Sequence, residues 1–361
     1  MIKPPKLQTG DTVAIISLSS GLLGEPFMVH QKQLIEERLR SFGLKVIYTP
    51  NALKNMDFIK SNPQKRAEDL KWAFRNSSIK GIICAIGGDD TYRTVPYLLN
   101  DQEFIDSVKQ NPKLFIGFSD STINHFVFYK LGLSTLYGHC AIVDFAELDK
   151  VMLPYSKEWF AKLFVKEKNI EIKSSPIWYL ERQDFSEAAL VTPRISKAEE
   201  KGFEVLVGSG NVSGDLFGGC LESIYDLLTG ERHGDEVLFN KEYTLFPSLE
   251  ELRGKIFFLE TSEEKPAPEK LGEMLKVLDN YGVFQVMRGL IIGKPQDETF
   301  YEEYKQRYME IIGKYGKPIF YNVNFGHAYP RCILPYGCKA TLDCEHKKII
   351  LNDGLVGEGM V

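Results

Sequence analysis

The first hydrophobic segment of the chain, residues 13–18, is a continuous apolar run of strand length. A short polar turn follows it, and residues 31–42 then form an amphipathic stretch. Because the run is apolar on both faces, it predicts a strand buried in a parallel sheet. Gly43 stands in the usual position for ending a helix, and the next apolar run begins directly after it. The pattern therefore predicts a strand, a helix and a second strand.

The same alternation continues along the N-terminal half. It predicts a helix at residues 63–76, a strand at 81–86, a helix after Thr91 and a strand at 113–117. Strands that alternate with helices of this length favour βαβ units and a doubly wound parallel sheet. Ligands of such sheets bind beyond the carboxyl ends of the strands. The segments to inspect are therefore Ser19-Ser20, Gly87-Gly88-Asp89-Asp90 and Ser119-Asp120.

The C-terminal half has a second apolar set, and a less regular region precedes it. Three prolines interrupt residues 151–208, which we interpret as a connector with a loop or small hairpin. Short strands are then predicted at residues 214–228, 255–259, 289–293, 318–320 and 348–351, with helices at 268–281 and 301–315. We expect an N-terminal domain at residues 1–165, a connector at 166–208 and a C-terminal α/β domain at 209–361.

Composition narrows the class of protein. The 361 residues are 43% hydrophobic and 26% charged, which is ordinary globular usage. Lys plus Arg number 44 against 49 for Asp plus Glu, and a net charge of −5 disfavours nucleic acid and anionic membranes as partners. The six cysteines are scattered without a C-x-x-C pair, so we expect reduced thiols and no metal site.

The hydropathy of the chain gives the expected location. The first seven residues lack the apolar core of a secretory signal. No apolar run approaches the roughly 20 residues that span a bilayer. We therefore expect a cytoplasmic protein that does not contact membranes.

The first candidate for chemistry is Ser119, which directly follows an apolar strand and precedes a helix. A serine on such a turn exposes its hydroxyl, and the helix N-terminus offers N–H groups to an oxyanion. The motif departs from G-x-S-x-G because Ser121 replaces the second glycine. For an isolated Gly-x-Ser-Asp, a cap for the following helix provided by Ser119 or Asp120 is the favoured explanation.

The second candidate is the pair Gly87-Gly88 after a predicted strand. Glycine lets a backbone N–H approach a phosphate or an oxyanion closely. A plain tight turn is the simpler interpretation. A nucleotide-kinase loop of the Gly-Gly-Asp-Gly type is a further alternative, although Asp90 stands where that loop has glycine.

Two further candidates lie in the C-terminal half. Glu260 ends an apolar strand, where a carboxylate can orient an imidazole. Its neighbours Glu263 and Glu264 are interpreted as solvated charges or first residues of a helix. His327 lies in a loop after a strand, which suits a general base better than the positions of the other five histidines. Serine, glutamate and histidine together supply nucleophile, orienting group and base.

The combined motifs resemble those of the LD-carboxypeptidases and of the related microcin C self-immunity carboxypeptidases. The resemblance covers nearly the whole chain. The motifs that carry it are Gly87-Gly88, Gly117-Phe118-Ser119-Asp120, Gly218-Gly219-Cys220-Leu221, Phe258-Leu259-Glu260 and Phe325-Gly326-His327 with Leu334-Pro335-Tyr336-Gly337. Many members have Gly-Gly-Asn-Leu in the third motif, and we interpret Cys220 as a neutral packing residue.

This resemblance implies a serine carboxypeptidase with the triad Ser119, Glu260 and His327. It also implies oxyanion donors at the N–H of Asp120 and of Gly88 or Asp89, and no metal or organic cofactor. The implied fold has a Rossmann-like N-terminal domain and a smaller C-terminal α/β domain with the active site at their interface. Such proteins are commonly homodimers and cut an amide bond beside a terminal carboxylate.

The substrate stays open between two classes. The segment between Ser119 and Glu260 is longer than in cell-wall recycling LD-carboxypeptidases, which resembles the branch that acts on peptidyl or aminoacyl nucleotides. Trp178 in this segment can stack on a base, which contributes roughly 1–3 kcal/mol, or can close a hydrophobic cluster. Arg93 and Arg331 are candidates for binding the substrate carboxylate. A murein tetrapeptide is the alternative substrate.

Two other functions are weighed against hydrolysis. Phosphoryl transfer by the Gly-Gly-Asp-Asp loop requires Mg²⁺ and phosphate-binding lysines, and the chain has no Gly-x-x-x-x-Gly-Lys motif. A binding module that only sequesters a ligand would not need the serine, glutamate and histidine.

Overall fold

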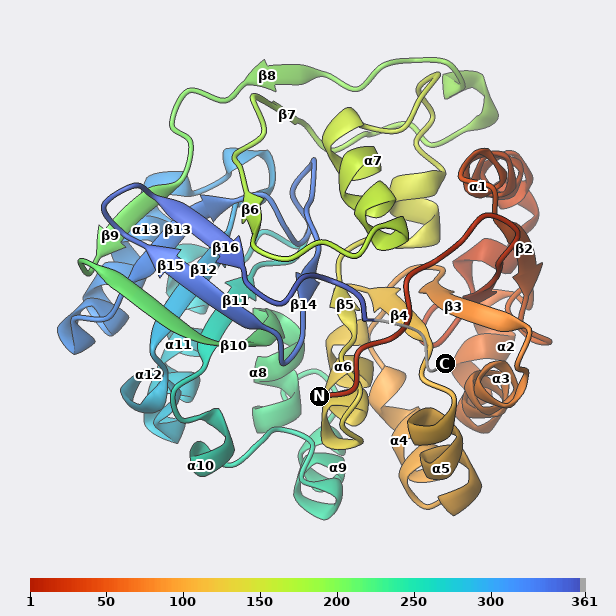
Figure 1. The fold of residues 1–361 in the computed structure, drawn as a ribbon, viewed down its shortest axis with the longest axis horizontal. Helices are drawn as coiled ribbons and strands as arrows, with labels where there is room; N and C mark the ends of the chain where they lie inside the picture. The colour runs from red at the N-terminus through yellow and green to blue at the C-terminus, as the bar shows by residue number, and fades with distance from the viewer. Residues whose placement is uncertain (358–361) are drawn as a thin grey trace. The chain divides into compact units, whose positions relative to one another are not determined.

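The computed structural model describes residues 1–357, which form two compact units. Unit 1 consists of Met1–Lys166, Arg182–Arg194 and the chain from Leu355. Unit 2 consists of Glu167–Glu181 and Ile195–Gly354. The predicted connector is thus divided, because residues 182–194 pack with unit 1, while residues 167–181 and 195–208 belong to unit 2. Figure 1 traces both units along the chain.

Unit 1 contains a parallel sheet in the order β5-β4-β3-β1-β2. Its strands are β1 (Thr12–Ile16), β2 (Lys45–Tyr48), β3 (Ile79–Cys84), β4 (Leu114–Gly117) and β5 (Leu136–Tyr137). Its helices are α1 (Val29–Ser41), α2 (Met56–Ser61), α3 (Pro63–Arg75), α4 (Val95–Leu99), α5 (Gln102–Gln110), α6 (Ser121–Lys130) and α7 (Pro154–Ala161). The alternating pattern of the N-terminal half is confirmed.

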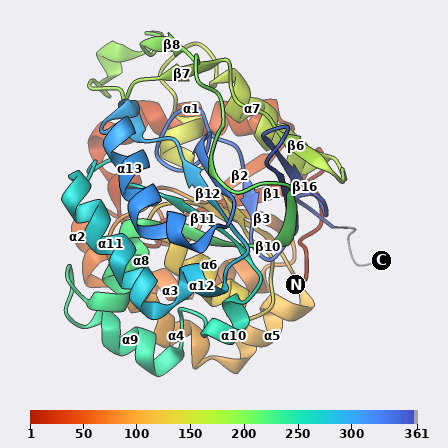
Figure 2. The ribbon, with the colours of Figure 1, turned by 90° about the vertical axis from the view of Figure 1, so that its left-hand side faces the viewer.

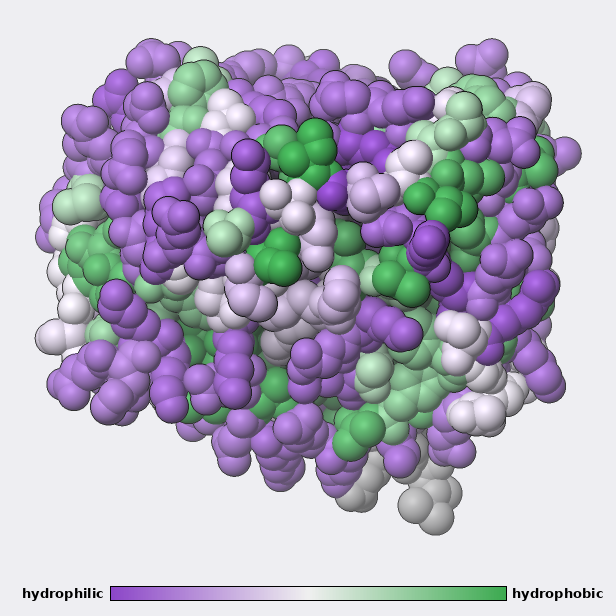
Figure 3. Space-filling view, turned by 90° about the horizontal axis from the view of Figure 1, so that it is seen from above, coloured by the Kyte–Doolittle hydropathy of each residue, from purple (hydrophilic) through white to green (hydrophobic). Residues whose placement is uncertain are grey.

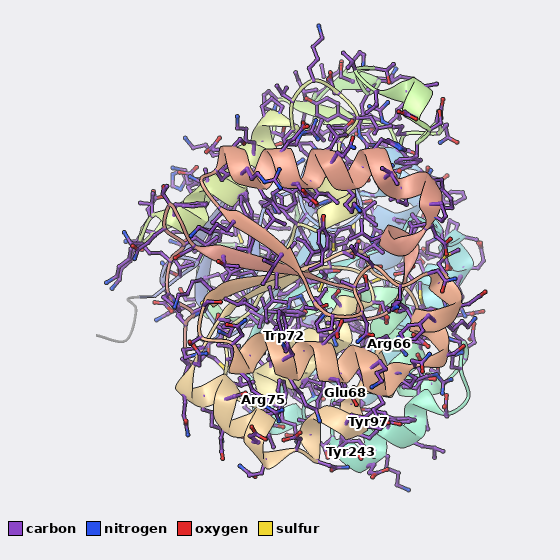
Figure 4. All side chains as sticks on the ribbon, turned by 90° about the vertical axis from the view of Figure 1, so that its right-hand side faces the viewer. Arg66, Glu68, Trp72, Arg75, Tyr97 and Tyr243 are labelled. Atoms are coloured by element: carbon purple, nitrogen blue, oxygen red, sulfur yellow. The ribbon has the colours of Figure 1, made fainter. Side chains whose placement is uncertain are left out.

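The sheet of unit 1 is covered by helices on both faces. Figure 4 shows α1 on one side of the strands and α3 on the other. Every residue of β4 is buried, and β1 is buried from its second residue on. The segments that are apolar on both faces therefore form the buried strands of the sheet, as the sequence pattern predicts.

The loops at the carboxyl edge of this sheet are tied to one another. The Thr91 N–H donates to Oδ2 of Asp120 at 2.9 Å, and the Thr91 hydroxyl donates to the carbonyl of Leu18 at 3.2 Å. The Asp90 N–H donates to the hydroxyl of Ser19. The segments that follow β1, β3 and β4 therefore meet, which is where a doubly wound sheet binds its ligands.

Unit 2 contains a mixed sheet in the order β6-β16-β15-β10-β11-β12-β13-β9. The central strands β10 to β13 are parallel, and the outer pairings are antiparallel. The strands of the unit are β6 (Ile170–Ile172), β7 (Ile177–Tyr179), β8 (Ser196–Ala198), β9 (Glu204–Val207), β10 (Asn211–Cys220), β11 (Ile256–Glu260), β12 (Gly289–Gly293), β13 (Ile319–Val323), β14 (Leu334–Pro335), β15 (Lys339–Asp343) and β16 (Lys348–Leu351).

Helices pack against the central strands of unit 2. They are α8 (Leu221–Thr229), α9 (Glu236–Tyr243), α10 (Leu249–Leu252), α11 (Pro268–Tyr281), α12 (Val283–Val286) and α13 (Tyr301–Ile312). Figure 2 shows α11 and α13 side by side against β11 and β12. The α/β fold class with two domains is confirmed.

The prediction of a strand at residues 214–228 is wrong in part. Residues 214–228 form the end of β10 and then α8, because the apolar positions after Cys220 recur at helical spacing and their side chains are buried. The hairpin expected in the connector corresponds to β7 and β8, which pair antiparallel.

The next feature is the absence of a membrane-spanning helix among the described residues. No helix in this part of the chain combines the length and the apolar character needed to cross a bilayer. The face seen in Figure 3 is mostly hydrophilic, and its hydrophobic residues form small scattered groups.

Candidate active site

Ser119 lies on a strained turn between β4 and α6. β4 ends at Gly117 and α6 begins at Ser121, so only three residues make the turn. The φ of Ser119 is 63°, in the left-handed region that residues other than glycine rarely adopt. The side chain is half-buried, and the N–H donates to the hydroxyl of Tyr137 at 3.2 Å. A serine on a strand-to-helix turn of this kind can present its hydroxyl to a substrate.

The Gly-Gly loop after β3 packs directly against this turn. A Cβ on Gly87 would lie 2.8 Å from Cβ and 2.9 Å from Oγ of Ser119, and 3.3 Å from the backbone nitrogen of Asp120. Only glycine allows this approach. Asp120 precedes the first residue of α6, where backbone N–H groups lack partners within the helix. The predicted oxyanion donors Gly88, Asp89 and Asp120 are thus brought to one place within unit 1, while their role stays a prediction.

A buried ion pair holds the loop from behind. Nη1 of Arg66 lies 2.6 Å from Oδ1 of Asp90, and Nη2 lies 3.3 Å from Oδ2. Both side chains are almost fully buried, and Nη1 also donates to the carbonyl of Leu18. The Asp90 carboxylate is therefore used in a structural pair. That use argues against a phosphate-binding Gly-Gly-Asp-Asp loop.

His125 supports the end of β4 from within α6. Its Nε2 lies 3.0 Å from the carbonyl of Gly117, which can only accept, so Nε2 carries the proton. Nδ1 then accepts from the hydroxyl of Thr135 at 2.7 Å. Burial lowers the pKa of His125 to about 3. The ring is therefore a neutral packing group.

Glu260 and His327 form a close pair in unit 2. Glu260 is the last residue of β11, and His327 follows β13 in a loop. Oε2 of Glu260 accepts the backbone N–H of His327 at 3.0 Å and the Nδ1–H at 2.7 Å. Gly326 makes this approach possible, because a Cβ there would lie 2.4 Å from Cγ of Glu260. The pair orients the imidazole and fixes its tautomer.

Cys220 lies beside this pair because of strand register. It ends β10 and is the register partner of Glu260 on β11. Donor atoms of Cys220, Glu260 and His327 all lie within 4.8 Å of one another, a set that a zinc-like ion can use. Burial raises the pKa of the Cys220 thiol well above its usual range, so the thiol is protonated at neutral pH. It packs beside the site as expected.

Glu263 is a site residue that the sequence interpretation missed. Its side chain is 64% exposed, as expected of a solvated charge, but its Oε2 lies 2.9 Å from Nε2 of His327. Glu264 is exposed as well, and its carboxylate pairs with Arg232 instead of His327. The only sequence signal for Glu263 is its place three residues after Glu260, on the loop that leaves β11.

The candidate substrate-binding residues occupy different surroundings. The ring of Trp178 on β7 is 8% exposed, and Nζ of Lys294 lies 4.7 Å from its centroid. Arg93 follows the Gly-Gly loop, with Nε 3.7 Å from Oδ2 of Asp90. Arg331 is fully buried, and its Nη2 donates to the carbonyl of His327 at 3.1 Å. Arg331 therefore braces the loop of His327, and its contact with a substrate carboxylate stays a prediction.

The fold and this set of residues are those of an α/β serine peptidase. Models of the LD-carboxypeptidase N-terminal and C-terminal domains match residues 13–138 and 213–342, respectively. The chain belongs to the LD-carboxypeptidase family, and within it to the MccF-like branch.

Similar proteins of known structure or curated function support this family membership. The structure of an MccF-like protein from Streptococcus pneumoniae in complex with AMP is 46% identical, covers 95% of this chain and 99% of its own, and has a TM-score of 0.92. The microcin C7 self-immunity protein MccF of Escherichia coli is 29% identical, over 96% of this chain and 94% of its own length. A probable murein peptide carboxypeptidase of Bacillus subtilis is 27% identical, over 99% and 96%.

Proposed function

We propose that this protein is a serine carboxypeptidase in which Ser119, Glu260 and His327 act as the triad. His327 takes the proton of the Ser119 hydroxyl through Nε2, while Glu260 holds the proton on Nδ1. Ser119 then attacks the carbonyl of an amide bond beside a terminal carboxylate. The acyl-enzyme that forms is hydrolysed by water. The observation that carries this proposal is the hydrogen-bonded Glu260–His327 pair in a member of this family.

The oxyanion of the tetrahedral intermediate needs preorganised donors. We assign this role to the N–H groups of Asp120 and of Gly88 or Asp89. The close packing of Gly87 on Ser119 supports the assignment, because it leaves no side chain between the loop and the nucleophile. Removing one such donor lowers kcat by about 10²- to 10³-fold in comparable enzymes.

We propose an aminoacyl or peptidyl nucleotide as the substrate. The support is the 46% identical MccF-like protein, whose structure holds AMP. A murein tetrapeptide is the second candidate, and it is favoured by the similarity to the probable murein peptide carboxypeptidase. Trp178 is the residue on which a base would stack. Lys294 lies over the Trp178 ring, so it would either move away or stay on one face while the base stacks on the other.

The test offers both substrate classes side by side. Wild type and Ser119→Ala are incubated with an aminoacyl-sulfamoyl adenosine and with a murein tetrapeptide, and the products are identified by mass spectrometry. We expect wild type to release the amino acid from the nucleoside analogue and Ser119→Ala to release nothing. Undiminished cleavage by Ser119→Ala would disprove the triad. Cleavage of the tetrapeptide alone would disprove the nucleotide assignment and support the second candidate.

A further inference from the structure

Both ring nitrogens of His327 face a carboxylate. Oε2 of Glu260 lies 2.7 Å from Nδ1, and Oε2 of Glu263 lies 2.9 Å from Nε2. The two carboxylates differ in exposure, since the side chain of Glu260 is 1% exposed and that of Glu263 is 64% exposed. Glu260 is thus a fixed partner, while Glu263 reaches the ring from the solvent side.

This arrangement suits a charged ring. A neutral imidazole has one N–H and can donate to one carboxylate, whereas an imidazolium donates to both. Burial opposes the charge on His327, but Glu260 and Glu263 outweigh it and raise the pKa of His327 to about 10. The hydrogen bond with His327 in turn lowers the pKa of Glu263 to about 2. The carboxylates facing the two ring nitrogens therefore favour the doubly protonated ring over the neutral one.

A charged ring cannot take the proton of a serine hydroxyl. The general base must be neutral and must offer an unoccupied Nε2 to the nucleophile. Glu263 fills that nitrogen, so its carboxylate has to leave before His327 can act.

The charged groups around the ring indicate what could draw Glu263 away. Glu260 and Glu263 face the ring nitrogens, and Glu222 lies beside Cys220 next to the pair. Arg331 donates to the backbone carbonyl of His327 rather than to a ring nitrogen. Arg232 is paired with Asp226 and with Glu264. Among the contacts described within unit 2, the groups that face the His327 ring nitrogens are carboxylates. Their negative charge favours a cation on the incoming ligand.

We propose that Glu263 is a specificity-determining residue that binds an ammonium group of the substrate. The carboxylate moves from Nε2 to that ammonium, and the imidazolium releases its Nε2 proton to water. Neutral His327 then accepts the proton of Ser119. The substrate class this selects is an acyl residue with a free amino group near the scissile carbonyl. The inference rests on the proposed function, because it takes His327 as the base.

The neighbouring residue provides a matched control. Glu264 has the same side chain and a similar exposure of 56%, but its carboxylate binds Arg232 at 2.8 Å. Glu264→Gln removes a nearby charge without touching the imidazole contact. Glu263→Gln removes the charge that the proposal uses.

The kinetic test compares two substrates that differ only at the amino group. Wild type, Glu263→Gln and Glu264→Gln are assayed with an aminoacyl-sulfamoyl adenosine whose α-amino group is free or acetylated. The preference is the ratio of kcat/KM for the free amine to kcat/KM for the acetylated substrate. We expect this ratio to be at least about tenfold smaller in Glu263→Gln than in wild type. The acid limb of its pH profile should also move to lower pH, while Glu264→Gln behaves as wild type. An unchanged preference in Glu263→Gln, even with lower rates on both substrates, would overturn the proposal.

A second measurement does not depend on turnover. Nitrogen NMR of the His327 ring in Ser119→Ala reports its protonation at neutral pH. We expect a charged ring without ligand and a neutral ring once the free-amine substrate is added, but not the acetylated one. A neutral ring without ligand would overturn the Glu263 contact. Cleavage by Ser119→Ala would instead overturn the proposed function, and the NMR result would still decide the role of Glu263.

Discussion

One carboxylate oxygen of Glu260 accepts two hydrogen bonds from His327, one from the backbone N–H and one from Nδ1–H. The backbone bond fixes where the loop lies, and the ring bond fixes which nitrogen carries the proton. A single buried side chain therefore controls both the position and the tautomer of the proposed base.

Glu260→Gln should lower kcat by about 10³- to 10⁴-fold with little change in KM. The amide can present its NH₂ group to Nδ1, which then accepts, so that the proton moves to Nε2 and the ring cannot act as base. Steady-state kinetics on the cleaved substrate give the result, and circular dichroism controls for folding. A kcat within tenfold of wild type would show that Glu260 does not set the tautomer.

Gly326→Ala should lower kcat by about 100-fold or more, because displacing a catalytic group by about 1 Å has an effect of that size. The new Cβ would lie 2.4 Å from Cγ and Oε2 of Glu260, at a φ of +82° that alanine rarely adopts. The matched control is Gly234→Ala, since a Cβ on Gly234 meets no atom within 4 Å. Equal activities of the two variants would contradict the expectation.

Asp90→Ala should lower the free energy of unfolding by about 3–5 kcal/mol, because it leaves the buried guanidinium of Arg66 without its carboxylate. Glu68 comes from the same helix as Arg66, as Figure 4 shows, but pairs with Lys65 at the surface. Glu68→Ala should therefore change stability by less than about 1 kcal/mol. Urea unfolding of both variants measures the difference, and similar losses would refute the structural role of the Arg66–Asp90 pair.

The low pKa of His125 predicts a specific pH dependence of stability. The folded-state value of about 3 lies below the unfolded value of about 6.5, so the unfolded chain binds a proton first as pH falls. The stability contribution is present above pH 6.5 and is lost at about 1.4 kcal/mol per pH unit below it. His125→Gln should unfold with a shallower loss of stability between pH 6 and about 4. Parallel curves for the two proteins would count against a neutral buried ring.

The fold could be predicted, and Ser119, Glu260 and His327 could be selected as candidates, because their sequence signals are local; the roles of these three residues stay predictions. Strand runs, the glycine at a helix end and the serine after β4 are each visible within a few residues. Glu260 and His327 stand out for the same reason, as polar residues at or after a strand end.

The contacts that the sequence does not specify join distant segments. The position of Cys220 beside Glu260 follows from the register of β10 and β11, which no single segment encodes. The contact of Glu263 depends on the course of the loop after β11, and charge alone suggests a solvated side chain. The Arg66–Asp90 pair joins a helix to a loop after the next strand, and no spacing rule connects them.

The left-handed backbone at Ser119 has a consequence for the evolution of this turn. At a φ of 63° glycine would fit without the steric strain that serine bears. The residue that performs the proposed chemistry is thus one that folding disfavours, and a drift to glycine would silence the enzyme without harming its fold. A chain with glycine at this place would keep the turn and lack the hydroxyl that the proposed mechanism uses.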